Sequence, residues 1–284
     1  MILITGATGT IGRLVAEQLA DTLPLRLLTR APVRAAALWG PRTEVVGGDF
    51  DDPGTLRVAL SGVRSALLVT ANPLSPAQDV NFVNAACAVG VQHVVKLSAQ
   101  AVTDPEATDL ITEWQRENER LLRASQLSWT LLRPRAYMSN TLSWSRSIRA
   151  EGVVRAVHGT ASNATIDPRD VADVAVRALT DPETHAGRVY ALTGPKALTV
   201  VEQTEVLGGL LRRPLRFEEL TIDQAKCGLL DRYPSAIAEA LLESAVRLHL
   251  GAKGHVHPAV RDVLGRPART YHAWAADHLD PFRV

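Results

Sequence analysis

Residues 2–12 set the architecture of the chain, and they run Ile2-Leu3-Ile4-Thr5-Gly6-Ala7-Thr8-Gly9-Thr10-Ile11-Gly12. The leading apolar residues predict a short buried strand, and after the glycines apolar residues recur at helical spacing. Three glycines occupy the turn between the two elements, where they permit backbone conformations that other residues avoid. The segment therefore predicts a strand, a tight glycine turn and a helix in direct succession.

The same alternation continues through the first half of the chain. Apolar runs predict further strands at residues 25–28, 44–46, 66–70, 93–97 and 129–132. Parallel strands need helical crossovers between them, and strands without polar alternation are covered on both faces. The predicted fold class is therefore α/β, a doubly wound parallel sheet of the Rossmann type, with a small C-terminal α/β substrate lobe.

Two of the crossover helices have predicted buried faces. One helix precedes the strand at 93–97, and its face consists of Val80, Val83, Asn84 and Cys87. A longer helix spans residues 106–124, and its face consists of Leu110, Ile111, Trp114, Leu121 and Leu122. Both faces are expected to pack on the sheet.

The organisation along the chain is predicted as follows. Residues 1–150 form the Rossmann domain, and a helix at 171–179 and a strand at 188–192 return to its sheet within about 165–195. Residues 196–284 form a mainly helical lobe, with helices at 199–211 and 235–250 and a strand at 215–220.

Composition excludes several classes of protein. The 284 residues are 46% hydrophobic and 21% charged, which is typical of a folded globular protein and not of a disordered one. Lys and Arg number 31 against 30 Asp and Glu, so no charge excess indicates a nucleic-acid partner. Two widely spaced cysteines suit a reducing compartment, and no run approaches the roughly 18 apolar residues of a membrane span. We expect a soluble, cytoplasmic protein without signal peptide that binds neither nucleic acid nor membrane.

The glycine turn predicts a site for the pyrophosphate of a dinucleotide. Gly6 permits the tight exit from the strand, Gly9 lets the pyrophosphate approach the backbone, and Gly12 lets the helix lie close to the sheet. The free N–H groups and the positive end of the helix would then hold the phosphates. The alternative is a glycine loop without a ligand.

The residues after the second and third strands predict which dinucleotide binds. The second strand ends at Thr29-Arg30, with Arg34 one turn later, and no acidic residue is present to bind a ribose 2′-hydroxyl. A guanidinium group matches phosphate geometry, so NADP is predicted as the cofactor, unless these arginines are ordinary surface residues. Asp49-Phe50, after the third strand, is placed to border the adenine; the alternative is an ordinary turn.

Several motifs together resemble the NmrA-like branch of the atypical short-chain dehydrogenase/reductases. Besides the glycine turn they are Gly48-Asp49-Phe50, Val94-Val95-Lys96-Leu97-Ser98, Trp129-Thr130-Leu131-Leu132-Arg133-Pro134, Tyr137-Met138-Ser139-Asn140, Ile166-Asp167, Asp170-Val171-Ala172-Asp173-Val174-Ala175, Gly265-Arg266-Pro267-Ala268-Arg269 and Trp274. The likeness covers nearly the whole chain.

This resemblance implies a function and a set of cofactor contacts. The family includes NAD(P)H-dependent reductases of quinones and other conjugated carbonyls, and regulators that bind the dinucleotide without turnover. By resemblance, the cofactor would be lined by Thr8, Thr10, Ile11, Arg30, Asp49, Thr70, Ala71, Asn72 and Ser98. Tyr137 and Met138 would lie near the nicotinamide, and the C-terminal lobe would close over the substrate.

The Tyr-x-x-x-Lys pair of many related ketone reductases is absent. In such a pair the ammonium group lowers the pKa of the phenol four residues away on the helix. None of the four tyrosines here is followed by lysine at that spacing. In relatives that keep only the lysine, it stands four residues before a glutamate; if that is Glu119, the position holds Gln115.

The remaining candidates for catalysis are Tyr137 and Ser98. Tyr137 could donate a hydrogen bond to a carbonyl, or be a packed aromatic residue. For Ser98 a cap of its strand or a contact with the cofactor is favoured over a role as an acid. His249, His255 and His257 lack a carboxylate or cysteine to complete a ligand set, so no metal is expected. The hypothesis is an NADPH-dependent oxidoreductase that reduces a conjugated carbonyl, a quinone or a secondary-metabolite intermediate, with an apolar small molecule as substrate. A redox-sensing regulator and a non-redox cyclase or isomerase are the alternatives.

Overall fold

The computed structural model describes residues 1–37, 39 and 43–283, which divide into two compact units. The sheet unit comprises Met1–Ala99, Trp114–Arg133 and Pro168–Ala191. The second unit comprises Gln100–Glu113, Pro134–Asp167 and Leu192–Val284. Each unit is thus assembled from three separate segments of chain. The predicted division into residues 1–150 and 196–284 stays a prediction.

A seven-stranded sheet forms the centre of the sheet unit. Its strands are β1 (Ile2–Ile4), β2 (Leu25–Thr29), β3 (Thr43–Gly47), β4 (Ser65–Leu68), β5 (His93–Leu97), β6 (Ser128–Pro134) and β8 (Arg188–Leu192). Their spatial order is β3-β2-β1-β4-β5-β6-β8, and β1 pairs in parallel with both β2 and β4. This order reverses between β1 and β4, the point where doubly wound sheets bind their ligands, so the predicted fold class is confirmed.

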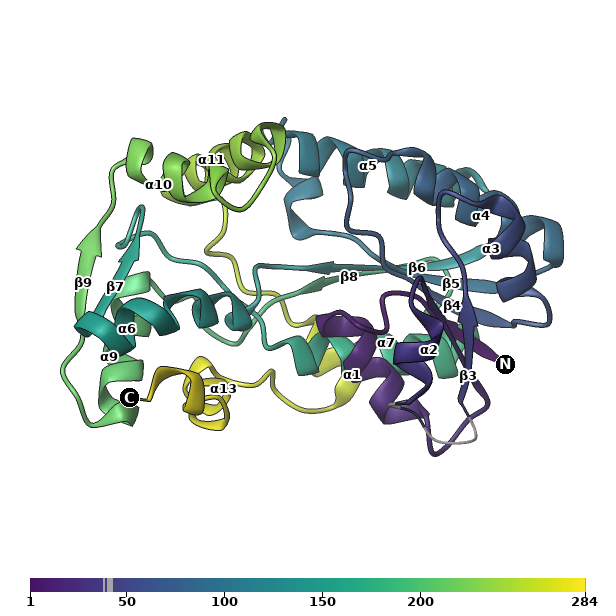
Figure 1. Cartoon of the computed structure of the whole chain (residues 1–284), viewed down its shortest axis with the longest axis horizontal. Coiled ribbons are helices and arrows are strands. Elements are labelled where there is room, and N and C mark those ends of the chain that lie inside the picture. Colours follow the sequence, from purple (N-terminus) through teal and green to yellow (C-terminus); the bar gives the residue numbers. More distant parts are fainter. Residues whose placement is uncertain (38, 40–42, 284) are drawn as a thin grey trace. The chain divides into compact units, whose positions relative to one another are not determined.

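Helices cover both faces of this sheet (Figure 1). They are α1 (Thr10–Leu19), α2 (Pro32–Ala36), α3 (Pro53–Leu60), α4 (Ala77–Val89), α5 (Leu110–Ala124), α7 (Pro168–Thr180) and α8 (Pro182–His185). On one face α1 packs against α7, where Gln18 donates a 2.9 Å hydrogen bond to Asp173; on the other face α3 packs against α4. One core cluster joins buried side chains of the strands to Leu56, Phe82 and Leu122 of the second layer.

The predicted face of α4 is wrong for Val80, Asn84 and Cys87, which are exposed. The buried face instead contains Asp79, Phe82, Val83, Ala85 and Ala86. A carboxylate at the start of this face disguised its helical periodicity, because charged residues are rarely buried without a partner.

The predicted start of α5 is also wrong, because the helix begins at Leu110 and not at residue 106. Asp109 ends the preceding loop: its Oδ1 accepts a 3.0 Å hydrogen bond from the backbone N–H of Thr112, as an N-cap does. Leu110 itself is exposed. The buried face of α5 is largely polar, with Thr112, Gln115, Asn118 and Glu119 beside Trp114 and Leu122.

The second unit has its own elements and core. The elements are η1 (Gln100–Thr103), η2 (Met138–Trp144), α6 (Ser145–Glu151), β7 (Val153–Ala156), α9 (Val200–Leu211), β9 (Arg216–Glu219), α10 (Ile222–Leu230), α11 (Ser235–His249), α12 (Ala259–Leu264), α13 (Tyr271–Asp277) and η3 (Asp280–Phe282). Strands β7 and β9 pair in parallel, and a separate cluster packs Met138, Ile148 and Val154 against Leu207 and Trp274. The predicted strand at 215–220 is therefore half of a two-stranded sheet whose other strand has no predicted counterpart.

Candidate active site

The glycine turn between β1 and α1 has a conformation that requires glycine at two positions. Gly6 has φ +63°, in the left-handed region that side chains disfavour. A Cβ atom on Gly12 would lie 2.3 Å from the carbonyl oxygen of Gly6, which is far inside van der Waals contact. The backbone N–H of Gly9 donates a 2.9 Å hydrogen bond to that same oxygen and closes the turn.

Helix α1 starts in a way that suits an anion. Gly9 is its N-cap; no side chain in the described structure caps this end, and its first turn contains no acidic residue. Thr8 and Thr10 are exposed beside it, whereas Ile11 and Gly12 are buried against the sheet. Uncapped N–H groups and the helix dipole attract phosphate, so these residues fit the pyrophosphate of a dinucleotide.

Arg30 follows the last residue of β2 and is exposed. Within residues 1–37, 39 and 43–283 its side chain makes no hydrogen bond or ion pair, so its guanidinium is available to a ligand. Arg34 lies in α2, but its side chain falls outside the described part of the chain.

Asp49 and Phe50 form the exit from β3. Asp49 accepts a 3.0 Å hydrogen bond from the backbone N–H of Asp51, and Asp52 caps α3. The ring of Phe50 packs on Phe82 with centroids 6.0 Å apart. The turn weighed in the sequence analysis is thus present, and it leaves contact with an adenine as a prediction.

Thr70, Ala71 and Asn72 follow β4, at the carboxyl edge of the sheet. Ala71 and Asn72 are exposed, and Asn72 folds onto its own turn by accepting a 3.1 Å hydrogen bond from the N–H of Leu74. Thr70 is buried, and its hydroxyl accepts a 2.7 Å hydrogen bond from Nζ of Lys96. The structure therefore ties one predicted cofactor residue to a buried lysine that the sequence analysis did not single out.

Lys96 lies on β5 with no solvent exposure of its side chain. Its Nζ is 2.7 Å from Oδ1 of Asp79 on α4 and 5.5 Å from the ring centroid of Trp114. Burial lowers the pKa of the Lys96 ammonium, and the nearby Asp79 carboxylate opposes that shift. A lysine within an otherwise apolar strand was the sequence signal for this pair.

Ser98, one residue past β5, is buried and donates a 2.6 Å hydrogen bond to Oε1 of Glu119 on α5. Arg133 on β6 also binds Glu119, with a 2.8 Å hydrogen bond from Nε to Oε1. Burial acts to raise the pKa of Glu119, but the hydrogen bonds from Arg133 and Ser98 outweigh it and hold the pKa below its ordinary value. The Ser98 proton is thus engaged by a carboxylate, and its oxygen is left to accept.

Tyr137 and Met138 belong to the second unit. Tyr137 is half-buried, and burial raises the pKa of its phenol, so the phenol stays protonated across the physiological range. Met138 is buried in the core of its unit. The other predicted site residues lie in the sheet unit, and of Arg34 only the backbone is described.

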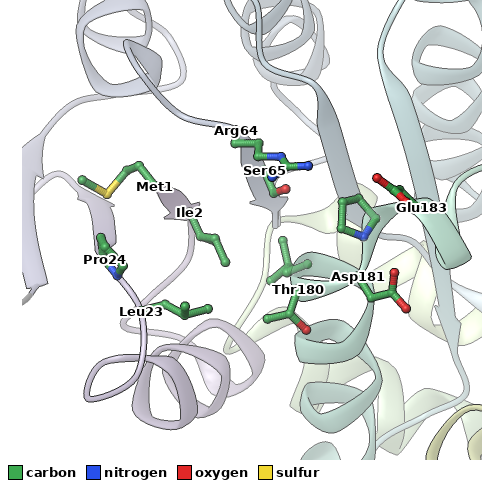
Figure 2. Close-up of a pocket in the computed structure, with 11 residues that line it drawn as sticks. Met1, Ile2, Leu23, Pro24, Arg64, Ser65, Thr180, Asp181 and Glu183 are labelled. Carbon is green, nitrogen blue, oxygen red and sulfur yellow. The ribbon is translucent and has the colours of Figure 1, made fainter.

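A pocket of about 280 Å³ lies at the other end of the sheet (Figure 2). Ile2 and Ser65, the first residues of β1 and β4, line it together with Thr180, Asp181 and Glu183. Doubly wound folds bind ligands at the carboxyl ends of their strands, where the glycine turn lies, so this pocket is not the candidate active site.

Four histidines of the second unit form two ring pairs, His158 stacked on His249 and His255 edge-on to His257. The rings of His158 and His249 are 4.5 Å apart, as are those of His255 and His257. Among the residues with described positions, no group of His, Cys, Asp or Glu is arranged to hold a metal ion. None of the helices that the described residues form is long and apolar enough to cross a bilayer.

Comparison with known proteins places this geometry in context. Residues 6–182 match the model of a family described as NAD(P)H-binding. The chain is 51% identical to the (4-alkanoyl-5-oxo-2,5-dihydrofuran-3-yl)methyl phosphate reductase of Streptomyces griseus, over 99% of each chain. It is 34% identical to the NAD(P)H azoreductase of Xenophilus azovorans, again over 99% of each. The crystal structure of the Escherichia coli NADPH-dependent quinone oxidoreductase complexed with NADPH superposes with a TM-score of 0.87 at 28% identity, covering 98% of this chain and 99% of that one.

Proposed function

Because this chain belongs to the NAD(P)H-binding, NmrA-like branch of the atypical short-chain dehydrogenase/reductases and is an NAD(P)H-dependent reductase, we propose that it reduces a small lactone whose ring double bond is conjugated to carbonyl groups. The predictions of family, reductase class and NAD(P)H binding are thereby confirmed. The cytoplasmic location stays a prediction.

The identity of the substrate is supported by the relative from Streptomyces griseus. That enzyme is named for a dihydrofuranone that carries an alkanoyl group, a ring oxo group and a methyl phosphate, and it is 51% identical to this chain over nearly all of both. We therefore propose a phosphorylated alkanoyl-dihydrofuranone as the substrate class.

Such a ring reduces the demand on the protein for a strong acid. When bound, NADPH supplies a hydride to the carbon–carbon double bond. The two carbonyl groups conjugated to that bond spread the resulting negative charge over their oxygens, so the adjacent carbon can then be protonated by a weak acid or by water. This chemistry is compatible with a chain that has no Tyr-x-x-x-Lys pair.

Two residues of this chain are proposed to act on the substrate and cofactor. Tyr137, whose phenol remains protonated, would donate a hydrogen bond to a substrate carbonyl and stabilise the developing negative charge. Ser98, positioned by Glu119, would accept a hydrogen bond from the cofactor. The glycine turn would hold the pyrophosphate, and the exposed guanidinium of Arg30 would hold the 2′-phosphate and so favour NADPH over NADH.

Deuterium transfer tests this proposal directly. Purified protein would be incubated with an alkanoyl-dihydrofuranone methyl phosphate and with NADPH deuterated at its transferable position. We expect consumption of NADPH and a product that has gained one deuterium from the cofactor, transferred as deuteride, and one proton from water.

The alternatives give different results in the same assay. A product of unchanged mass would identify a cyclase or isomerase. No turnover of dihydrofuranones or quinones, by protein that binds NADPH and NADP⁺ with different affinities, would identify a redox-sensing regulator.

A further inference from the structure

Arg135 has a buried guanidinium group with almost no hydrogen-bond partners. It directly follows β6, and only 9% of its surface is exposed. Among the described residues, its five N–H donors make one hydrogen bond, a 3.5 Å contact from Nη2 to the carbonyl oxygen of Ala252. Its Nε is buried and has no hydrogen-bond partner in the part of the chain that the structure describes. Buried donors in native proteins rarely lack a hydrogen-bond partner, so we expect a bound ligand to supply an additional acceptor to this guanidinium.

A second cation lies beside Arg135 within the second unit. Lys253 is the next residue after Ala252; it is half-buried and its Nζ donates a 2.5 Å hydrogen bond to Oγ of Ser244 on α11. Burial, together with the positive charge of Arg135, lowers the pKa of Lys253 to about 8. The two cations therefore share one environment and repel each other.

The neighbouring carboxylates do not satisfy these cations. Asp104 makes a two-pronged ion pair with Arg247, at 2.7 and 2.8 Å. Asp109 accepts hydrogen bonds from the backbone N–H and the hydroxyl of Thr112. Both carboxylates act electrostatically on these cations, but among the described residues neither Arg135 nor Lys253 donates a hydrogen bond to either of them.

Two further polar side chains of the second unit, His257 and Gln100, can also donate hydrogen bonds to an anion. His257 is half-buried, and its pKa is lowered by burial, by His255 and by the charge of Arg135. Gln100 is buried with its side-chain amide nitrogen 3.4 Å from Nε2 of His257. A half-buried lysine and histidine on the loop between α11 and α12 give the buried guanidinium a connection to solvent.

We infer that Arg135 and Lys253 form a binding site for a phosphate monoester, and that this site holds the phosphate group of the substrate. The second part rests on the proposed function. A guanidinium fork binds two phosphate oxygens at once, and an ammonium group adds a mobile point charge. A dianionic phosphate would supply the missing acceptor and relieve the repulsion between the two cations.

Binding of a simple phosphate ester tests the site without any turnover. Butyl phosphate would be titrated calorimetrically into protein saturated with NADP⁺, so that the phosphate sites of the cofactor are already filled. We expect Arg135→Gln and Lys253→Met each to weaken binding about 10- to 100-fold, the range for one lost charge-assisted hydrogen bond. Arg135→Lys keeps the charge and loses the guanidinium fork, so its affinity for butyl phosphate is expected to lie between those of wild type and Arg135→Gln. Thermal unfolding would verify that each variant is folded.

A matched control removes the same charge elsewhere. Lys196 is an exposed lysine that pairs with Glu202 at 3.4 Å, so Lys196→Met should leave the affinity for butyl phosphate within about twofold, as expected for an exposed pair. The inference is overturned if wild-type protein does not bind butyl phosphate, or if Lys253→Met and Lys196→Met bind it equally well.

Kinetics with two matched furanones separate this inference from the proposed function. One carries the methyl phosphate and the other a hydroxymethyl group. We expect wild-type kcat/KM to favour the phosphate ester, and Arg135→Gln to remove that preference through KM. If both furanones are reduced equally well and Arg135→Gln changes neither, the proposed function stands and this inference fails. If neither is reduced but butyl phosphate binding depends on Arg135 and Lys253, the proposed function fails and the phosphate site stands.

Discussion

Lys96 Nζ and Asp79 Oδ1 lie 2.7 Å apart, and only 0% and 2% of the two side chains reach solvent. This ion pair joins β5 to α4 within the sheet unit. Nζ also donates to Thr70, so the pair holds the residue that begins a predicted cofactor-binding segment. Removing charges from water is expensive, and the pair persists because each charge compensates the other.

Substitution of one partner should therefore destabilise the folded protein more than substitution of both. Lys96→Met leaves Asp79 buried and unpaired and should lower the free energy of unfolding by about 3–5 kcal/mol, measured by urea denaturation. The double variant Lys96→Met/Asp79→Leu should recover most of that loss. A single variant as stable as wild type would show that the pair does not exist in solution.

Gly12→Ala should disrupt the glycine turn, because the added Cβ would lie 2.3 Å from the carbonyl oxygen of Gly6. We expect weaker NADPH binding, by about tenfold or more, and a loss of stability of about 1–3 kcal/mol from the forced displacement. Gly209→Ala is the matched control: that glycine lies in α9 with no atom within 4 Å of the added Cβ, and the change should stabilise by about 0.5–1 kcal/mol. Equal NADPH affinities in the two variants would contradict the role of the turn.

Arg30→Ser should change the cofactor preference. Loss of the guanidinium should reduce kcat/KM with NADPH by about 10- to 100-fold and leave the value with NADH within about twofold. Arg57 is an exposed arginine on α3, and Arg57→Ser should alter neither value. If Arg30→Ser lowers kcat/KM equally with both cofactors, the guanidinium does not bind the 2′-phosphate.

Tyr137→Phe should lower kcat for the furanone by about 10- to 100-fold, because it removes one hydrogen bond to a carbonyl oxygen whose negative charge grows during the reaction. The affinity for NADPH, measured by fluorescence titration, should be unchanged. Tyr233→Phe removes a hydroxyl from an exposed tyrosine and serves as the control. An unchanged kcat in Tyr137→Phe would indicate that solvent or another group stabilises that charge.

The lowered pKa of Lys253 predicts a pH dependence of stability. The pKa is about 8 in the folded protein, against the ordinary lysine value of 10.5, so between these values the unfolded chain binds more protons. The stability of wild type relative to Lys253→Met should therefore rise as the pH increases from about 8 to about 10. Arg135 and Arg247 oppose the charged lysine, whereas Asp109 and Asp104 favour it. If the difference in free energy of unfolding between wild type and Lys253→Met, measured by urea denaturation, does not change with pH, the Lys253 ammonium is hydrated in the folded protein.

The sequence predicted the sheet well because its signals are local. A run such as Ile2-Leu3-Ile4 before a glycine turn needs no tertiary information, and the predicted strand at 93–97 matches β5 residue for residue. Helix faces were predicted less well. The buried faces of α4 and α5 carry Asp79 and Glu119, and a buried charge cannot be told from an exposed one until its partner is known. Those partners are Lys96 on β5, Arg133 on β6 and Ser98 just past β5.

The second unit was harder for a related reason. Strand β7 has four residues and pairs with β9, which lies about 60 residues later in the chain, so no local sequence pattern predicts this strand. Arg135 and Lys253 are likewise far apart in sequence. Their proximity depends on the loop after α11, and the sequence analysis gave neither of them a role.

The three-segment construction of each unit also constrains synthesis and engineering. The sheet unit is complete only once Ala191 has emerged from the ribosome, so its core must wait for most of the chain before it closes. A truncation after residue 133 would leave it without α7 and β8. A chimaera of two relatives made with a single crossover point would divide at least one of the units wherever that point lies, so chimaeras should transplant all three segments of the second unit together.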